Sequence, residues 1–215
     1  MKGFLISFEG GEGCGKSTQI KKFLTYLQEH GYDYICTREP GGTPVGEEIR
    51  NILLHSKDNL SAKTEFLLFS ASRNKLIEEV VKPALDAGKI VVLDRFYDSS
   101  YTYQGYAGNL NIKDIKNITD FAIDGITPNL TILLDLDYKK GMERKSKDEN
   151  LKNLDRIESK SADYHIKVRE GYLKLARKNK KRIAIVNAND TIDNIAEKIA
   201  ITFENKYKYA TKTQK

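Results

Sequence analysis

The segment from Gly10 to Ser17 constrains the fold of this 215-residue chain more than any other. It has the pattern Gly-x-x-x-x-Gly-Lys-Ser and lies between a short apolar run and a stretch with helical periodicity. In that context backbone N–H groups can surround phosphate groups, and the helix directs its positive end toward them. Lys16 adds a full charge, and the Ser17 hydroxyl lies where the pattern places a Mg²⁺ ligand. The predicted phosphate-binding residues are Gly10, Gly11, Glu12, Gly13, Cys14, Gly15, Lys16, Ser17 and Thr18.

Five short runs of apolar and β-branched residues alternate with helical patterns along the chain. They span residues 3–8, 32–37, 89–94, 130–136 and 182–187. This alternation predicts an α/β fold with a five-stranded parallel sheet and helices on both faces, because parallel strands need long crossovers and bury both sides. No proline-rich or serine-rich linker divides the sequence, so residues 1–215 are predicted to form a single domain.

Helical patterns fill the intervals between these runs. The first predicted helix follows the phosphate loop and ends at His30. The second spans 44–55 with Thr43 as N-cap, and the third spans 61–88 with a kink at Pro83. Others cover 99–106, 112–125 and 159–178, and a last helix begins after Thr191. In this arrangement ligands bind at the carboxyl ends of the strands.

Charged side chains gather where the predicted strands end. Asp94, after the third run, can hold Mg²⁺ and the adjacent Arg95 can neutralise phosphate, although Asp94 could instead cap the next helix. Arg38, Arg50, Arg73 and Arg95 suit bidentate contacts to a phosphate or a base edge. Phe69 lies four residues before Arg73 on one helix face, where the pair could hold a nucleobase or Phe69 could simply be core.

The stretch 138–158 is rich in lysine and arginine and poor in apolar residues, so we do not expect it to contribute to the core. It can be a solvated loop. Because it follows the fourth run, we prefer the interpretation that it is a lid whose cations reach a transferring phosphate when substrate is bound.

Composition limits the other classes of function. The charged fraction of 31% and the hydrophobic fraction of 40% are ordinary for a globular protein, and the apolar runs are too short to cross a bilayer. The two cysteines form no metal or disulfide pattern. The net charge of +6 is scattered and need not indicate nucleic acid. We therefore expect a cytoplasmic protein whose partners are small polyphosphates, not nucleic acid or membranes.

Several motifs together resemble the thymidylate kinase family. They are the segment 8–18, Thr37-Arg-Glu-Pro-Gly-Gly-Thr43, Leu93-Asp-Arg-Phe96, Ser99-Ser100 with Tyr103-Gln104-Gly105, and Asp155-Arg-Ile-Glu158. They occur in the family's order over nearly the whole chain. The resemblance implies the P-loop nucleoside monophosphate kinase fold, a homodimer, and Mg²⁺-dependent transfer of the γ-phosphate of ATP to dTMP, giving dTDP and ADP.

The resemblance also implies roles for individual residues. The predicted dTMP-binding residues are Arg38, Glu39, Pro40, Arg50, Phe69, Arg73, Arg95, Ser100, Tyr103 and Gln104. Arg38, Arg50 and Arg95 would bind the phosphate. Phe69 would stack on thymine, Arg73 would bond its carbonyl edge, and Pro40, after a cis peptide, would lie near its methyl group. Tyr103 would favour deoxyribose, and Ser100 and Gln104 would contact the base.

One position departs from some members of that family. Where those members carry an arginine in the phosphate loop, this chain has Gly13. The missing charge is then expected from the lid, with Arg144 first and Lys147 and Lys145 behind it. The predicted catalytic residues are Glu12, Lys16, Arg95, Arg144 and Lys147, and the predicted metal ligands are Ser17 and Asp94.

Two other functions stay open at this point. One is a kinase for another deoxynucleoside monophosphate, which an acceptor screen would separate. The other is a nucleotide-dependent switch or ATPase, although the sequence lacks an Asn-Lys-x-Asp guanine-reading motif.

Overall fold

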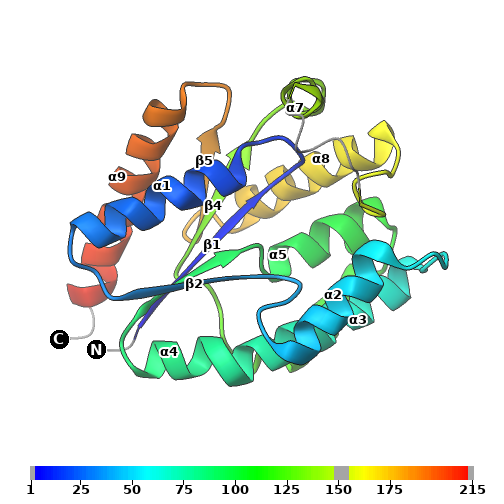
Figure 1. Ribbon diagram of the computed structural model, residues 1–215, viewed down its shortest axis with the longest axis horizontal. Helices are drawn as coiled ribbons and strands as arrows, with labels where there is room; N and C mark the ends of the chain where they lie inside the picture. Colours follow the sequence, from blue (N-terminus) through cyan, green and yellow to red (C-terminus); the bar gives the residue numbers. More distant parts are fainter. Residues whose placement is uncertain (1–2, 148–154, 213–215) are drawn as a thin grey trace.

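The computed structural model describes residues 3–147 and 155–212. Its strands form one parallel sheet in the order β2-β3-β1-β4-β5 (Figure 1). They are β1 (Phe4–Gly10), β2 (Tyr34–Arg38), β3 (Ile90–Asp94), β4 (Leu130–Asp135) and β5 (Ile183–Asn187). The predicted five-stranded parallel sheet is therefore confirmed, and every predicted strand end lies within two residues of the observed one.

The helices are α1 (Lys16–Glu29), α2 (Pro44–His55), α3 (Ala62–Leu76), α4 (Lys82–Asp86), α5 (Tyr97–Ser100), α6 (Ile112–Ile123), α7 (Tyr138–Ser146), α8 (Ala162–Lys178) and α9 (Ile192–Lys212). Apart from α7, which lies in the stretch predicted to be a lid or loop, the helices follow the predicted intervals. Two π-helical segments, η1 (Ile77–Val81) and η2 (Tyr101–Ala107), continue α3 and α5. Thr43 caps α2 as predicted, since its hydroxyl accepts a hydrogen bond from the Gly46 N–H at 3.0 Å. None of the described helices has the length and apolarity needed to cross a membrane.

The predicted long helix over 61–88 is divided, with η1 between α3 and α4. Pro83 lies in the first turn of α4. A proline has no N–H to donate, and its ring collides with the carbonyl four residues earlier. The wider π turn just before it accommodates both effects, so the predicted kink takes the form of a π-helical bulge.

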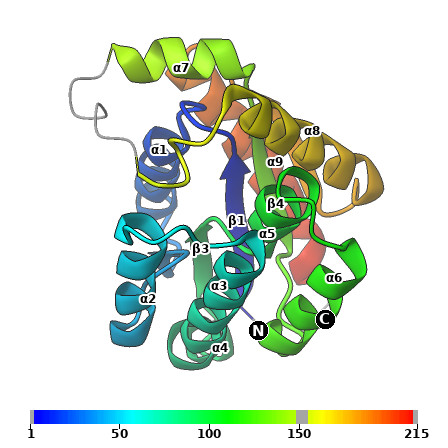
Figure 2. The ribbon, with the colours of Figure 1, turned by 90° about the vertical axis from the view of Figure 1, so that its right-hand side faces the viewer.

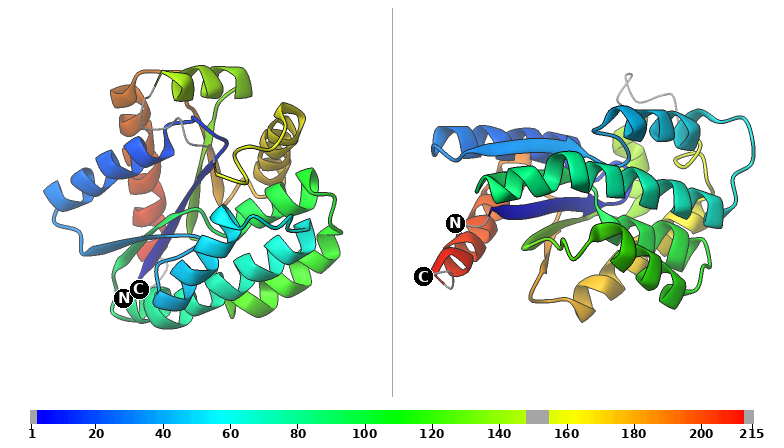
Figure 3. Two further views of the ribbon diagram at one scale, coloured as in Figure 1. Left: turned by 45° about the vertical axis from the view of Figure 1, so that its right-hand side comes forward. Right: turned by 90° about the horizontal axis from the view of Figure 1, so that it is seen from below.

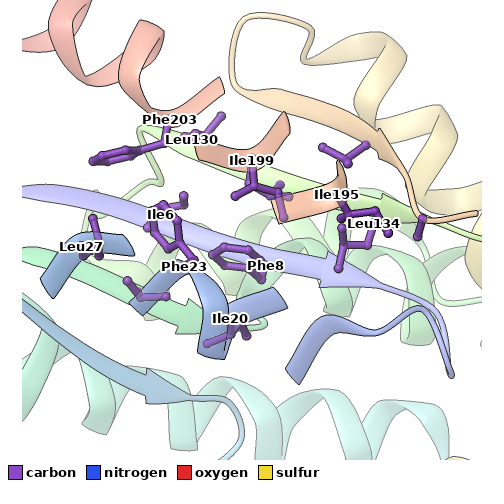
Figure 4. Packing of buried hydrophobic residues seen from close by; sticks show 14 of the residues in the cluster. Ile6, Phe8, Ile20, Phe23, Leu27, Leu130, Leu134, Ile195, Ile199 and Phe203 are labelled. Carbon is purple, nitrogen blue, oxygen red and sulfur yellow. The ribbon is translucent and has the colours of Figure 1, made fainter. Parts of the chain in front are cut away.

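Two layers of helices cover the sheet. On one face, Phe8 of β1 packs against Phe23 of α1, and Phe203 of α9 completes the same cluster (Figure 4). On the other face, Leu5, Val91 and Leu93 pack against α3, η1 and α4. Further along that face, Leu133 and the α8 residue Val168 belong to a third buried cluster. Both faces of the parallel sheet are thus buried, as the near-continuous apolar strands predicted.

The carboxyl ends of the central strands form the edge that carries the predicted site. β1 lies between β3 and β4, with Phe8 paired with Asp94, so the phosphate loop and the Asp94-Arg95 pair emerge side by side. Helix α7 lies over this edge (Figures 1 and 2). The start of β1 and the C-terminal part of α9 lie together at the opposite end (Figure 3), where the Phe4 and Phe203 rings are 5.7 Å apart.

Candidate active site

Two adjoining cavities open at this edge of the sheet. The first, of about 290 Å³, is lined by Arg38, Glu39, Pro40, Arg50, Phe69, Asp94, Ser100, Tyr103 and Gln104, among others. The second, of about 530 Å³, is lined by residues 11–19, by Arg144 and Lys145, and by residues 190–192 and Ile195. Five residues line both: Glu12, Lys16, Ser17, Arg95 and Glu158. These five mark the junction between the cavities.

The phosphate loop has the backbone that its glycines permit. Gly13 and Gly15 have φ angles of 69° and 84°, in the left-handed region, and Gly15 caps α1. Lys16 begins the helix and forms an ion pair with Asp94 at the end of β3. Of the predicted phosphate-binding residues, Gly11 to Thr18 line the second cavity. Gly10 lies behind it, and its carbonyl accepts a hydrogen bond from Arg95 at 3.0 Å.

Arg95 is held at the junction by several parts of the chain. Its backbone has φ 69°, which non-glycine residues seldom adopt. The Nη1 group donates to the Tyr172 hydroxyl at 3.2 Å, and Nη2 donates to Glu12 Oε1 at 3.2 Å. The guanidinium also lies 5.1 Å from the centre of the Tyr103 ring. Arg95 is thereby fixed before any phosphate binds.

Glu12 connects Arg95 to the neighbouring cations. The Tyr103 hydroxyl donates to Glu12 Oε1 at 3.2 Å. Burial by itself would raise the pKa of the Glu12 carboxyl, but the charge of Arg95, a hydrogen bond with Glu158 and the charges of Lys145 and Lys16 together outweigh it, and the pKa is lowered. Glu12 is therefore an ionised carboxylate, placed at the point where the two cavities meet.

Glu9 is a buried carboxyl beneath the junction that the sequence reasoning missed. It accepts hydrogen bonds of 2.7 Å from the Phe96 N–H, the Ser99 hydroxyl and the Tyr172 hydroxyl. Burial, followed by the nearby Asp98, raises the pKa of Glu9 to about 7. Tyr172 comes from α8, far away in sequence, and no motif in the sequence indicates this contact.

Some of the residues that line the first cavity have the apolar and hydrogen-bonding groups expected for a base. Phe69 and Pro40 line it, and the Glu39–Pro40 peptide is cis, as the resemblance implied. Arg73 is only 1% exposed and lies behind the wall. Its Nε donates to Glu39 at 2.8 Å and its Nη2 to Ser100 at 3.1 Å. Its buried Nη1 has no hydrogen-bond partner among the described residues.

Positively charged side chains also line the first cavity. Arg38 donates to both carboxylate oxygens of Glu47 at 3.0 Å, and Arg50 donates to the Pro40 carbonyl at 2.9 Å. Together with Arg95 they line one space, so the three predicted phosphate-binding arginines converge. The structure thus brings the predicted acceptor residues together, with Arg73 reaching the cavity wall through Glu39 and Ser100.

Helix α7 carries the predicted lid and packs directly on the phosphate loop. A Cβ atom at Gly13 would lie 2.7 Å from Gly141 Cα, and one at Gly141 would overlap the Glu12 carbonyl oxygen. The two backbones therefore touch, and an arginine at position 13 has no room here. The close packing of α7 on the phosphate loop therefore depends on glycine at position 13.

The lid cations differ in their surroundings. Arg144 donates to the Ala188 carbonyl at 3.0 Å, and Lys145 Nζ lies 2.5 Å from Glu158 Oε1. Both line the second cavity, whereas Lys147 follows α7, is exposed and lines neither cavity. Lys145 is buried in its pair with Glu158. Ile157 belongs to the third buried cluster, so the expectation that 138–158 does not contribute to the core is wrong at this position. The part of the predicted lid at 148–154 lies outside the described residues.

The residues present fit a magnesium ion. The Ser17 hydroxyl and the Asp94 carboxylate both lie at the first cavity, and such oxygen ligands suit Mg²⁺. No cluster of three or more His, Cys, Asp or Glu side chains suited to a metal occurs within 3–147 and 155–212.

The strand order and the paired cavities define a class of protein, the P-loop nucleotide kinases, in which a donor and an acceptor meet end to end. Comparison with known proteins gives the family. The family model for thymidylate kinase matches residues 8–199. The chain therefore belongs to the thymidylate kinase family.

The chain is similar in sequence to thymidylate kinases of several bacteria over most of their length. The thymidylate kinase of Thermoanaerobacter sp. (strain X514) is 49% identical over 187 residues, covering 87% of this chain and 90% of the relative. Those of Geobacillus sp. (strain WCH70) and Clostridium novyi (strain NT) are each 46% identical, covering 91% and 92% of this chain and 93% and 97% of the relatives.

Proposed function

We propose that the chain transfers the γ-phosphate of ATP to dTMP, with ATP in the second cavity and dTMP in the first. Membership of the thymidylate kinase family supports the reaction. The observation that carries the assignment of the cavities is their shared wall. Glu12, Lys16 and Arg95 line both, so two phosphate chains entering from opposite sides meet beside two cations.

The acceptor is proposed to lie with its phosphate against Arg38, Arg50 and Arg95. Its base then reaches Phe69 and Pro40, where a ring can stack and a methyl group can pack. The buried Nη1 of Arg73 lacks a hydrogen-bond partner in the part of the chain that the structure describes. This supports a hydrogen bond to a base carbonyl, because a buried donor without a partner is costly. The Tyr103 ring supports a preference for deoxyribose, and the polar groups of Ser100 and Gln104 complete the contacts.

The donor is proposed to place its phosphates on residues 11–18, with Lys16 moving with the transferred charge. The adenine would lie between the lid and the segment 187–192, near the contact of Arg144 with Ala188. Ser17 and Asp94 would hold Mg²⁺, whose charge would offset the negative charge of the phosphates.

Catalysis then needs position and charge, without a protein nucleophile. An oxygen of the acceptor phosphate attacks the γ-phosphorus in line, and Lys16, Arg95 and a lid cation meet the charge that develops. Arg144 remains the predicted lid cation, with Lys145 and Lys147 as the alternatives. Helix α7 on the phosphate loop supports the exclusion of water that would otherwise hydrolyse ATP.

A homodimer in the cytoplasm belongs to the same proposal. Phe121 on α6 is 88% exposed and Leu67 on the neighbouring α3 is 49% exposed, and a second copy of the chain would cover them. The two thiols, Cys14 and Cys36, are unpaired, as is usual in a reducing compartment. Sedimentation of wild type and Phe121→Glu tests the dimer, which the added charge should weaken.

An acceptor screen tests the reaction. Wild-type protein is given ATP, Mg²⁺ and dTMP, dUMP or dCMP in turn, and ADP and the nucleoside diphosphate are measured, with Lys16→Ala as the background control. We expect dTMP to exceed dUMP in kcat/KM by about 10- to 200-fold, the range for one methyl group in an apolar pocket. Faster turnover of another acceptor, or ADP formation without a diphosphate product, would contradict the proposal.

A further inference from the structure

The Gln104 side chain makes one hydrogen bond that the roles above do not use. Gln104 lines the first cavity and is 2% exposed. Its Nε2 donates to Oε2 of Glu65, a fully buried residue in the first turn of α3, at 3.2 Å. Within 3–147 and 155–212 the structure gives no hydrogen-bond partner to the other end of this amide, Oε1.

Glu65 itself is kept charged by two cations. Its Oε1 accepts from Arg156 Nη1 at 2.7 Å and from Lys160 Nζ at 2.8 Å. Burial would raise the pKa of Glu65, but the bonds from Lys160 and Arg156 outweigh it and the pKa is lowered. An ionised carboxylate can only accept hydrogen bonds.

The orientation of the Gln104 amide follows from this. The two ends of an amide have nearly the same shape and are told apart by their hydrogen-bond partners. Since Glu65 offers acceptors alone, the NH₂ end of Gln104 must face it. The carbonyl end, Oε1, is then the group left to meet a ligand in the first cavity. A neutral partner at position 65 would not impose this choice.

We propose that Glu65 is a positioning residue for base selection, which fixes the Gln104 amide so that Oε1 faces the base and accepts a ring N–H. Thymine and uracil carry such an N–H between their two carbonyls, whereas the matching nitrogen of cytosine is an acceptor. Cytosine would place two acceptors face to face, which a buried site rejects strongly. The inference rests on the proposed placement of the base in the first cavity beside Gln104.

The hydrogen bonds to Glu65 connect the proposed base selection to residues 155–160, the segment that follows the lid. Arg156, which holds Glu65, also donates from Nε to the Leu53 carbonyl at 2.9 Å. The charge of Glu65 is therefore anchored by the segment 155–160 and by the end of α2. Motif reading alone gave Arg156 no such role, because Glu65 and Arg156 are 91 residues apart.

The test compares acceptor ratios in four variants: Glu65→Gln, Gln104→Ala, the double exchange of Glu65→Gln with Gln104→Glu, and Lys160→Met. Each is assayed for kcat/KM with dTMP, dUMP and dCMP. Glutamine at position 65 can donate a hydrogen bond as well as accept one, so the Gln104 amide can rotate by half a turn and present its NH₂ group to the base. We expect the dTMP-to-dCMP ratio of Glu65→Gln to fall about tenfold or more, while the dTMP-to-dUMP ratio stays within about twofold, because both bases carry the N–H.

In the double exchange the carboxylate and the amide trade positions, so the group that faces the base should again be an acceptor. A carboxylate at position 104 can present acceptors alone, and an amide at position 65 can donate to it, so the dTMP-to-dCMP ratio should return to within about threefold of wild type. Lys160→Met removes one of the two cations that hold Glu65 but keeps the Glu65 carboxylate in place. Its dTMP-to-dCMP ratio should therefore equal that of wild type. A role in stability alone would lower turnover with all three acceptors together.

The outcomes separate this inference from the placement of the base. If Gln104→Ala lowers the dTMP-to-dCMP ratio and Glu65→Gln does not, Gln104 reads the base but Glu65 does not direct it, and the inference is overturned. If Gln104→Ala leaves the ratio unchanged, the proposed contact of Gln104 with the base is wrong and the inference falls with it. If Glu65→Gln does not fold, the double exchange decides: a wild-type ratio supports the inference and the ratio of Gln104→Ala overturns it.

Discussion

The contact between the lid and the phosphate loop makes a testable prediction for Gly141. This residue lies inside α7 and needs no left-handed backbone. Its replacement by alanine should favour the helix itself by about 0.5–1 kcal/mol. The added Cβ, however, would overlap the carbonyl oxygen of Glu12, a backbone atom that cannot rotate away. Helix stability and the position of the lid are therefore expected to change in opposite directions.

The size of the effect follows from the overlap. An ordinary van der Waals separation requires α7 to retreat by about 1 Å from the loop. Arg144 and Lys145 would retreat with it, away from the second cavity. Misplacement of catalytic groups by about 1 Å can cost about a hundredfold in rate. We expect kcat of Gly141→Ala to fall by about that factor. The KM for dTMP should change little, because Gly141 does not line the first cavity.

A steady-state assay of ADP formation with dTMP measures kcat, and thermal unfolding measures stability. Lys140→Ala is the matched control, since this exposed residue lies on the same helix and its replacement meets no such obstacle. We expect Gly141→Ala to unfold at or above the wild-type Tm and still to be slow. If Gly141→Ala turned over at the wild-type rate, the lid would not need its contact with Glu12 and the reasoning would be refuted.

Three further predictions follow from the site. Lys16→Ala and Arg95→Ala should each lower kcat by about a hundredfold or more in the same assay, the scale for one preorganised electrostatic contact, and near-normal turnover of either would contradict its role. Arg144→Ala should lower kcat more than it raises the KM for dTMP, because its contact forms in the transition state, and the reverse pattern would remove it from catalysis. The pKa of Glu9 is raised to about 7 in the fold by burial, so its contribution to stability is present below the unfolded pKa near 4.5 and is lost as the pH rises through 7. In urea unfolding, Glu9→Gln should therefore gain about 1–3 kcal/mol relative to wild type between pH 5 and pH 8, and a constant difference would show that Glu9 does not titrate there.

The sequence predicted the sheet because each strand is short, apolar and followed by a helical pattern. The same logic placed Lys16, Asp94 and Arg95 at one edge, since groups at the carboxyl ends of neighbouring parallel strands must meet. Helical spacing pointed to Phe69 and the resemblance added Pro40, and both line the first cavity. All of these predictions follow from the order of strands, helices and motifs along the chain.

The contacts behind the site could not be predicted in this way. Glu9 meets Tyr172, and Glu65 meets Arg156, across large separations in sequence. The first pair depends on how α8 packs on the sheet, and the second on how the segment after the lid packs on α2 and α3, which periodicity does not encode. Arg73 shows the same limit, because its helix position was correct but its buried pairing with Glu39 appears only in the folded chain.

The left-handed backbone of Arg95 has a consequence for protein engineering. Glycine or asparagine would suit this φ angle better, and a redesign guided by backbone preference alone would select one of them. Such a substitution would relieve about 1–2 kcal/mol of strain and at the same time delete the guanidinium from the wall that both cavities share. Efforts to make this enzyme more heat-resistant should therefore keep position 95 unchanged, however unfavourable it looks in isolation.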